Sequence, residues 1–222
     1  MNKIENIIIP DYTKGEEIFN MITHIVGGGL GILATVLCVI FASLHKNIYG
    51  IVSGAIFGTT MIVLYSMSSI YHGLNPNKKA KKIFRILDHC AIFLLVAGTY
   101  TPFSLCTLRN YSVTLGWSIF GIIWALAILG ITLNAIDLKK YNIISMILYL
   151  VMGWCIILTG KIVLNGLNIR GFLLLLFGGI SYSIGAIFYV FMKKTKYMHS
   201  VFHIFVLIGS LLHFLCILLY VM

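Results

Sequence analysis

Long apolar stretches, separated by short polar segments, follow one another along almost the whole chain. A transmembrane helix needs roughly 20 consecutive, mostly apolar residues. We therefore predict an all-α integral membrane protein in which seven transmembrane helices form one compact bundle. The predicted helices cover residues 23–44, 48–71, 88–108, 111–136, 141–160, 171–192 and 199–221, after a short N-terminal segment at residues 1–22.

Polar and turn-forming residues mark the ends of these stretches. Asn75-Pro76-Asn77 follows the second stretch, Lys139-Lys140 separates the fourth from the fifth, and Lys193-Lys194-Thr195-Lys196 precedes the seventh. The connections are short, and no stretch reads as a soluble domain or an internal repeat. Residues 1–222 are therefore predicted to form a single membrane domain.

The composition supports a membrane location and excludes several classes of protein. Hydrophobic residues make up 60% of the chain and charged residues 10%, and the mean hydropathy is +1.01. Soluble domains are about 45–50% apolar and about 25% charged. A soluble enzyme, a disordered tail or a nucleic-acid-binding module could not have this composition. The five cysteines show no CxxC spacing and predict small buried side chains rather than a disulfide framework.

Basic residues predict the orientation of the chain in the membrane. Lys and Arg outnumber Asp and Glu by 16 to 6, and cytoplasmic loops carry an excess of Lys and Arg. With the N-terminus inside and the C-terminus outside, 12 basic residues lie on the inner side and 4 on the outer side. The inner set is Lys3, Lys14, Lys78, Lys79, Lys81, Lys82, Arg85, Lys139, Lys140, Lys193, Lys194 and Lys196, and the outer set is Lys46, Arg109, Lys161 and Arg170.

Polar side chains gather at the predicted inner ends of three helices, where they are costly unless they have a function. Ser68 and His72 end the second helix, Asp88 begins the third, and His199 and His203 begin the seventh. A spacing of four residues places His199 and His203 on one helix face, about 6 Å apart along the axis. These two histidines could bind one metal ion, with His72 supplying a third nitrogen.

Three neutral imidazoles with a fourth position open are typical of catalytic zinc. Zinc lowers the pKa of its bound water from about 15.7 toward about 7, and Asp88 could then hold or deprotonate that water. Ser68 could orient a ligand, the water or a substrate carbonyl. The alternative is a set of ordinary interfacial histidines, because a pair at this spacing also arises by chance. The combination with a third histidine, Asp88 and Ser68 on one membrane side favours the metal site.

Two other histidines are weaker candidates for a supporting position next to the metal. His24 lies near the start of the first helix, and His89 follows Asp88 but points about 100° away from it. The motifs HExxH, GxSxG, Walker A and GxGxxG are absent from the sequence, so the chemistries that they carry have no support.

The order of the motifs resembles a known family. Along the chain stand Glu16-Glu17, Asn20, Thr23-His24, Ser68-x3-His72, Asp88-His89, Ala97-Gly98-Thr99-Tyr100-Thr101-Pro102-Phe103 and His199-x3-His203. This pattern, over nearly the whole chain, resembles the hemolysin III proteins, the bacterial branch of the progestin and adipoQ receptor family, in a superfamily that includes alkaline ceramidases.

The resemblance implies seven helices in a bacterial plasma membrane, with the N-terminus inside. It also implies zinc held by His72, His199 and His203, with Asp88 contacting the zinc through water and Ser68 nearby. Ceramidase-like cleavage of a lipid amide, in a cavity within the bundle, is the activity that it suggests.

Three functions remain open at this point. They are a zinc-dependent hydrolase of a lipid amide or ester, a non-enzymatic regulator of membrane lipid homeostasis with structural zinc, and a pore-forming cytolysin. The last is disfavoured because the polar residues gather on one side and do not line a path through the membrane. We expect membrane lipids as partners, with a lipid substrate or a fatty acid in the cavity. Nucleic acid is not expected, and neither is a peptide hormone, because only about 20 residues precede the first helix.

Overall fold

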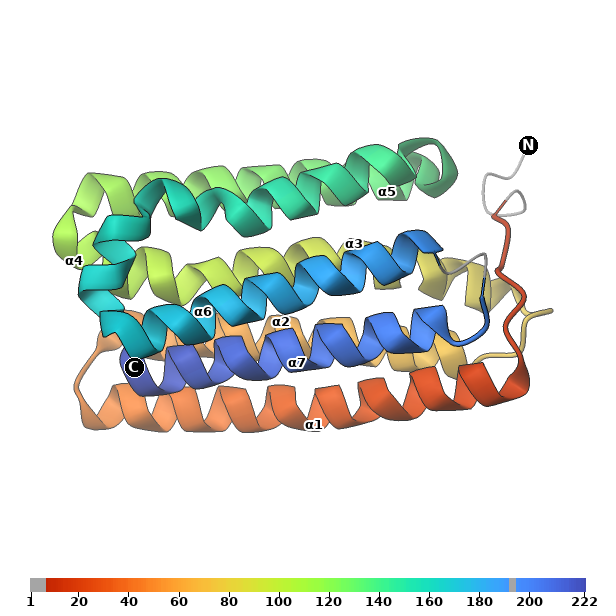
Figure 1. Cartoon of the computed structure of the whole chain (residues 1–222), viewed down its shortest axis with the longest axis horizontal. Coiled ribbons are helices and arrows are strands. Elements are labelled where there is room, and N and C mark those ends of the chain that lie inside the picture. The colour runs from red at the N-terminus through yellow and green to blue at the C-terminus, as the bar shows by residue number, and fades with distance from the viewer. Residues whose placement is uncertain (1–6, 192–194) are drawn as a thin grey trace.

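The computed structural model describes residues 7–191 and 195–222, and this part of the chain is almost entirely helical, without a strand. Figure 1 shows the helices lying roughly along one common direction. In chain order they are α1 (Lys14–Leu44), α2 (Ile48–Gly73), α3 (Lys79–Pro102), a π-helix (Phe103–Leu108), α4 (Arg109–Tyr111), α5 (Val113–Trp154), a 3-10 helix (Cys155–Thr159), α6 (Gly160–Phe191) and α7 (Met198–Tyr220).

Five helical segments are long and apolar enough to cross a membrane, judged by length and composition. They are Lys14–Leu44, Ile48–Gly73, Lys79–Tyr111, Val113–Val190 and Met198–Tyr220. The structure thus confirms an all-helical chain with several candidate membrane spans.

The segment Val113–Val190 is much longer than one membrane crossing, and its backbone leaves the helical conformation at two residues. Asp137 is extended (φ −160°, ψ 95°), and Asn168 has a positive φ (φ 54°, ψ 178°). The Ser145 hydroxyl donates to Asn134 Oδ1 at 2.6 Å across a separation of 11 residues. A straight helix would place these residues about 16 Å apart. The helix α5 therefore folds back at Asp137, and its two limbs run side by side (Figure 1).

Several helix ends differ from the predicted ones. The helix α1 begins at Lys14 rather than at residue 23, because Thr13 and Glu16 form a capping box. The helix α3 begins at Lys79 rather than at residue 88. Both extensions are polar, so a search for apolar stretches does not include them. The predicted starts at residues 48 and 199 lie within one residue of α2 and α7. The inner-side residues Lys3, Lys193 and Lys194 lie outside the described residues.

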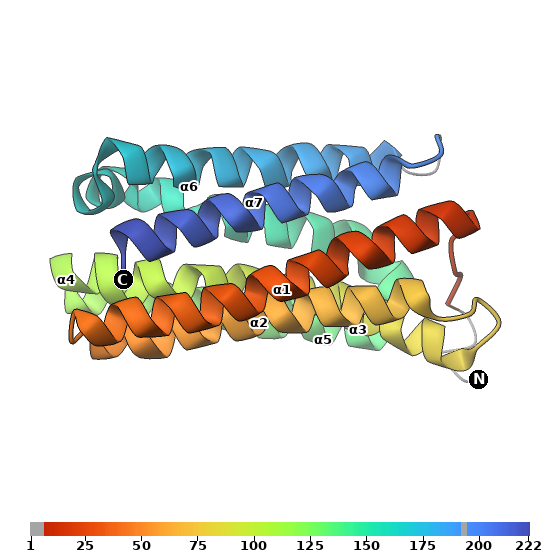
Figure 2. The ribbon, with the colours of Figure 1, turned by 90° about the horizontal axis from the view of Figure 1, so that it is seen from below.

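Small residues bring α1 and α2 into close contact. A Cβ atom on Gly31 would lie 2.9 Å from the backbone nitrogen of Ile62, and one on Gly58 would lie 2.6 Å from the backbone of Thr35. Figure 2 shows α1 crossing over α2 and next to α7. Glycine is required here because any side chain would separate the two helices.

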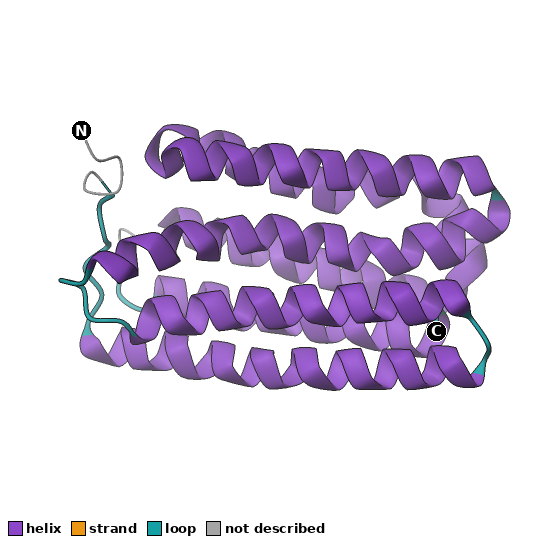
Figure 3. Cartoon of the chain, turned by 180° about the vertical axis from the view of Figure 1, so that it is seen from behind, coloured by secondary structure: helices purple, strands orange, loops and turns teal. Residues whose placement is uncertain are grey.

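The two ends of the bundle are chemically different. His45, which follows α1, donates from Nδ1 to the main-chain oxygen of Met222 at 3.0 Å. The C-terminus therefore lies at the end of the bundle where α1 finishes, and α1 begins at the opposite end. The end of α2 and the starts of α3 and α7 lie at that opposite end too (Figures 1 and 3). Ser68 and His72 lie in the last two turns of α2 and His199 and His203 in the first two turns of α7, whereas Asp88 lies in the third turn of α3.

Candidate metal centre

Three histidines from two helices meet at this end of the bundle. His72 lies in the last turn of α2, and His199 and His203 lie one turn apart at the start of α7. All three are buried, and each offers one nitrogen within 4.8 Å of the nitrogens offered by the other two. The Nε2 atoms of His199 and His203 are 3.0 Å apart. The sequence prediction that these histidines come together is confirmed.

The histidine group has the chemistry of a metal site. Zinc–nitrogen bonds of about 2.0–2.1 Å in a tetrahedron place neighbouring nitrogens about 3.4 Å apart, which is compatible with this cluster. Nε2 of His72 is buried and has no hydrogen-bond partner within the described residues. A buried polar atom without a partner costs about 1–3 kcal/mol. A bound cation would offset that cost, so the residues present fit a metal ion.

Ser68 and Asp88 line the same cavity as His199 and His203. The cavity has a volume of about 140 Å³ and lies among α1, α2, α3, α5, α6 and α7. The Ser68 hydroxyl is buried and lies next to the Asp88 carboxylate. Asp88 lies in the cavity wall and does not join the three-histidine group. Apolar side chains form much of the remaining wall, including Leu64, Ile92, Leu95, Val96, Phe202 and Val206.

The two weaker candidates differ in their surroundings. His24 stacks on His203 with ring centroids 3.7 Å apart, and both of its ring nitrogens are buried without a partner among the described residues. His89 donates from Nδ1 to the Arg85 carbonyl at 2.9 Å, and its Nε2 accepts from the Tyr189 hydroxyl at 3.2 Å. His24 is therefore the one that contacts a member of the histidine group.

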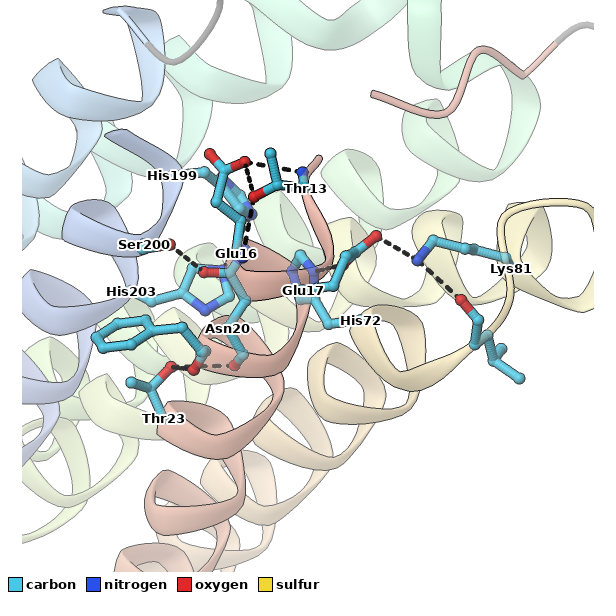
Figure 4. A network of polar contacts seen from close by, with 12 residues as sticks. Thr13, Glu16, Glu17, Asn20, Thr23, His72, Lys81, His199, Ser200 and His203 are labelled. Atoms are coloured by element: carbon cyan, nitrogen blue, oxygen red, sulfur yellow. Dashed lines mark hydrogen bonds and ion pairs between the residues drawn. The ribbon is translucent and has the colours of Figure 1, made fainter. Parts of the chain in front are cut away.

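The start of α1 holds the histidine-bearing helices in place (Figure 4). The Glu16 carboxylate accepts from the backbone nitrogen of Tyr197 at 2.7 Å, directly before α7. The Asn20 side chain accepts from the Ser200 hydroxyl at 2.7 Å, and the Glu17 carboxylate accepts from His72 Nδ1 at 2.6 Å. Sequence reasoning noted these three α1 residues as family motifs but assigned them no role. Their positions within about two turns of His24 on the same helix were the sequence signal that could have indicated a role near the histidine group.

Tyr12 covers the histidine group from the end of the bundle. Its ring stacks on His199 with centroids 5.1 Å apart and lies 5.8 Å from the ring of His72. Burial raises the pKa of the Tyr12 phenol above its usual range, so the side chain remains neutral. Tyr12 was not predicted from the sequence.

A second, larger hollow of about 1350 Å³ lies next to Tyr12 at the same end of the bundle. It shares four lining residues with the inner cavity, namely His89, Asn134, Asn142 and Tyr189. The two hollows are therefore adjacent, with these side chains between them.

Known proteins are similar to this chain over most of its length. Residues 12–214 match the family described as Haemolysin-III related. Hemolysin-3 from Bacillus cereus is 44% identical over 207 residues, which cover 93% of this chain and 92% of the relative. The Hemolysin-3 homolog from Bacillus subtilis (strain 168) is 44% identical over 209 residues, which cover 94% and 96%.

Similarity to human Monocyte to macrophage differentiation factor is weaker, at 24% identity over 167 residues, which cover 73% of this chain and 67% of the relative. The motif-based resemblance is thus confirmed by matches that extend over the whole bundle. The chain belongs to the haemolysin III-related family and is a multi-pass bacterial membrane protein.

Proposed function

We propose that this protein is a zinc-dependent hydrolase that cleaves an amide or ester bond of a membrane lipid. One observation carries the proposal: three buried imidazoles face one another next to a largely apolar cavity that Ser68 and Asp88 also line. A metal site at the edge of an apolar cavity suits a substrate with one polar, reactive carbonyl and an attached acyl chain.

Zinc on His72, His199 and His203 would activate a water molecule and polarise the substrate carbonyl. Asp88 accepts the proton that the attacking water loses. Ser68 donates a hydrogen bond to the carbonyl oxygen, on which negative charge develops. When the carbon–nitrogen or carbon–oxygen bond breaks, the proton passes from Asp88 to the leaving atom, and the products are a carboxylic acid and an amine or alcohol.

The cavity restricts which part of a lipid can enter. Its volume of about 140 Å³ is smaller than the ~300–1,000 Å³ typical of pockets that enclose a whole drug-sized ligand. The acyl segment next to the carbonyl would lie inside, and the rest of the lipid would remain in the bilayer. The partners in this proposal are membrane lipids and the fatty acid that the reaction releases.

We also propose seven membrane crossings, with the N-terminus in the cytoplasm and the C-terminus outside. The breaks at Asp137 and Asn168, which divide Val113–Val190 into three lengths, support this count. The opposite positions of the α1 start and the C-terminus support an odd number of crossings. Basic residues are in excess at the end of the bundle where α1 begins, and this excess supports placing that end in the cytoplasm.

Metal analysis of the purified protein, combined with lipid turnover, tests the hydrolase. We expect about one zinc per chain, loss of that zinc in His199→Ala/His203→Ala, and zinc-dependent cleavage of a lipid from a bacterial membrane extract. Asp88→Asn should keep the zinc and lose the cleavage, because Asp88 accepts a proton but is not among the three grouped ligands.

Three results would argue against the hydrolase in different ways. Full zinc in the doubly substituted protein would remove the metal site. Zinc bound at the site without a change in any lipid species would instead favour the regulator with structural zinc. Dye release from liposomes that depends on the protein would favour the cytolysin.

A further inference from the structure

One carboxylate connects the histidine of α2 to a buried lysine of α3 (Figure 4). Oε2 of Glu17 is 2.6 Å from Nδ1 of His72, and Oε1 accepts from the Lys81 ammonium at 2.5 Å. The His72 side chain is 0% exposed and that of Glu17 is 14% exposed. The sequence singled out neither Glu17 nor Lys81 as a functional residue.

The contact with Glu17 defines which nitrogen of His72 carries the proton. A carboxylate paired with an ammonium group is ionised and can only accept hydrogen bonds. Nδ1 of His72 must therefore be the donor, which leaves Nε2 with a free lone pair in the neutral ring. Nε2 is buried without a partner among the described residues, next to His199 and His203.

Lys81 holds the carboxylate in this orientation. Its side chain is completely buried, and its ammonium also donates to the Leu74 carbonyl at 2.9 Å and lies 5.0 Å from the centre of the Tyr71 ring. A buried ammonium is costly unless it is paired, so the lysine requires an acceptor at this position. The acceptor that it finds is the oxygen of Glu17 that does not contact His72.

We propose that Glu17 and Lys81 are positioning residues for the metal site. Glu17 fixes the ring of His72 with Nε2 toward the metal position, and Lys81 fixes Glu17. Carboxylates that accept from a metal-ligating histidine commonly orient the ring and raise its basicity, and their loss typically lowers metal affinity about 10–100-fold. The proposal rests on the metal site proposed above and is independent of whether the protein is a hydrolase.

A purely structural role makes a different prediction. The ion pair also connects α1 to α3, and a purely structural role would need only its two charges. If tying the helices together were its whole role, then every variant without the charges would bind metal equally. If Glu17 orients His72, then the variants differ according to whether position 17 can still accept from Nδ1.

Two neutral double variants separate these roles. Glu17→Gln/Lys81→Met keeps an amide oxygen for His72 Nδ1, whereas Glu17→Leu/Lys81→Met has no acceptor. Both variants lack the same two charges. We expect the variant with Leu to bind zinc about 10–100-fold more weakly than the variant with Gln, measured by competition with a chromophoric chelator.

The single variant Glu17→Gln provides a second test, in which the variant with fewer substitutions is expected to bind zinc more weakly than the double variant. Lys81 remains and attracts the amide oxygen, so the amide NH2 turns toward His72 and Nδ1 must become the acceptor. The ring proton then sits on Nε2, which blocks the metal-binding lone pair. We expect Glu17→Gln to bind zinc more weakly than Glu17→Gln/Lys81→Met, so that removal of the lysine restores affinity.

Cobalt substitution and a matched control complete the experiment. The visible absorption of bound Co²⁺ reports the geometry of the site, and we expect it to change in Glu17→Leu/Lys81→Met. Lys79→Met makes the lysine substitution at an exposed position of α3, away from the contacts that hold the histidine group. This variant should keep zinc affinity close to that of the parent.

Equal zinc affinity in the two double variants would overturn the positioning role while leaving the metal site intact. A parent protein that binds no zinc would overturn the metal site itself, and the positioning role with it. If Glu17→Gln alone does not fold, the comparison of the two neutral double variants still tests the positioning role of Glu17.

Discussion

At the scale of single residues, Ser200 shows how polar contacts stabilise this end of the bundle. Its hydroxyl donates to Asn20 Oδ1 at 2.7 Å, and both side chains are buried, Asn20 completely. In Ser200→Ala the Asn20 oxygen would lose its donor and remain buried. Because an unpaired buried acceptor costs about 1–3 kcal/mol, we expect a lower free energy of unfolding.

The unfolding of the metal-free protein in detergent measures this effect. Ser43→Ala is the matched control, because the Ser43 side chain is exposed and its hydroxyl donates to the Val39 carbonyl of its own helix. An equal loss of stability in both variants would contradict the importance of the buried contact.

The three histidines could be predicted from the sequence, whereas their supporting contacts could not. A spacing of four residues fixes the common face of His199 and His203, and the helix ends fix their depth with His72. The contact of Glu17 with His72 depends on the rotation of α1 against α2, which the sequence pattern does not specify. The roles of Ser68 and Asp88 in catalysis stay predictions.

At the scale of helices, the packing of α1 on α2 depends on glycines at the contact. A Cβ atom at position 58 would lie 2.0 Å from Thr35 Oγ1 and 2.6 Å from the Thr35 backbone, so Gly58→Ala requires the helices to move apart. We expect a loss of about 1–3 kcal/mol in the free energy of unfolding, as for other overpacked contacts.

Gly29→Ala is the control for this substitution on the partner helix. Apart from the neighbouring residues and backbone of its own helix, no atom of the described residues lies within 4 Å of the Cβ position of residue 29, and alanine favours a helix over glycine by up to about 1 kcal/mol. The control should be neutral or stabilising in the same unfolding experiment. A destabilised Gly29→Ala would show that the cost at position 58 is not one of close packing.

Hydropathy predicted the apolar parts of the helices and missed their polar extensions. The capping box of Thr13 and Glu16 starts α1 well before its apolar stretch, and this short motif was visible in the sequence. The sequence predicted a connection between two helices at residues 137–140, and the structure reverses direction at Asp137, within that connection. Hydropathy did not indicate that the reversal would be so tight, with one extended residue between the two limbs.

At the scale of the whole molecule, the proposed orientation can be tested by labelling from one side. Lys79 is exposed at the start of α3, and Tyr111 is 71% exposed beyond its far end. With the N-terminus inside, a membrane-impermeant maleimide applied to intact cells should label Tyr111→Cys and leave Lys79→Cys unlabelled.

The parent protein controls for its own cysteines, of which four are buried and Cys155 is partly exposed. Permeabilised cells should show labelling of both variants. The reverse pattern in intact cells would place the N-terminus outside and would move the histidine group to the opposite face of the membrane.

The histidine group has a consequence for how the protein is made. The α1 residues that hold the group are synthesised first, whereas His199 and His203 belong to the last helix. A nascent chain that ends before α7 contains only His72 of the three and would lack two of the proposed metal ligands. A ligand that binds only the native state stabilises that state by mass action. Metal would therefore protect completed, fully inserted chains, and membrane proteases would meet unfinished ones without that protection.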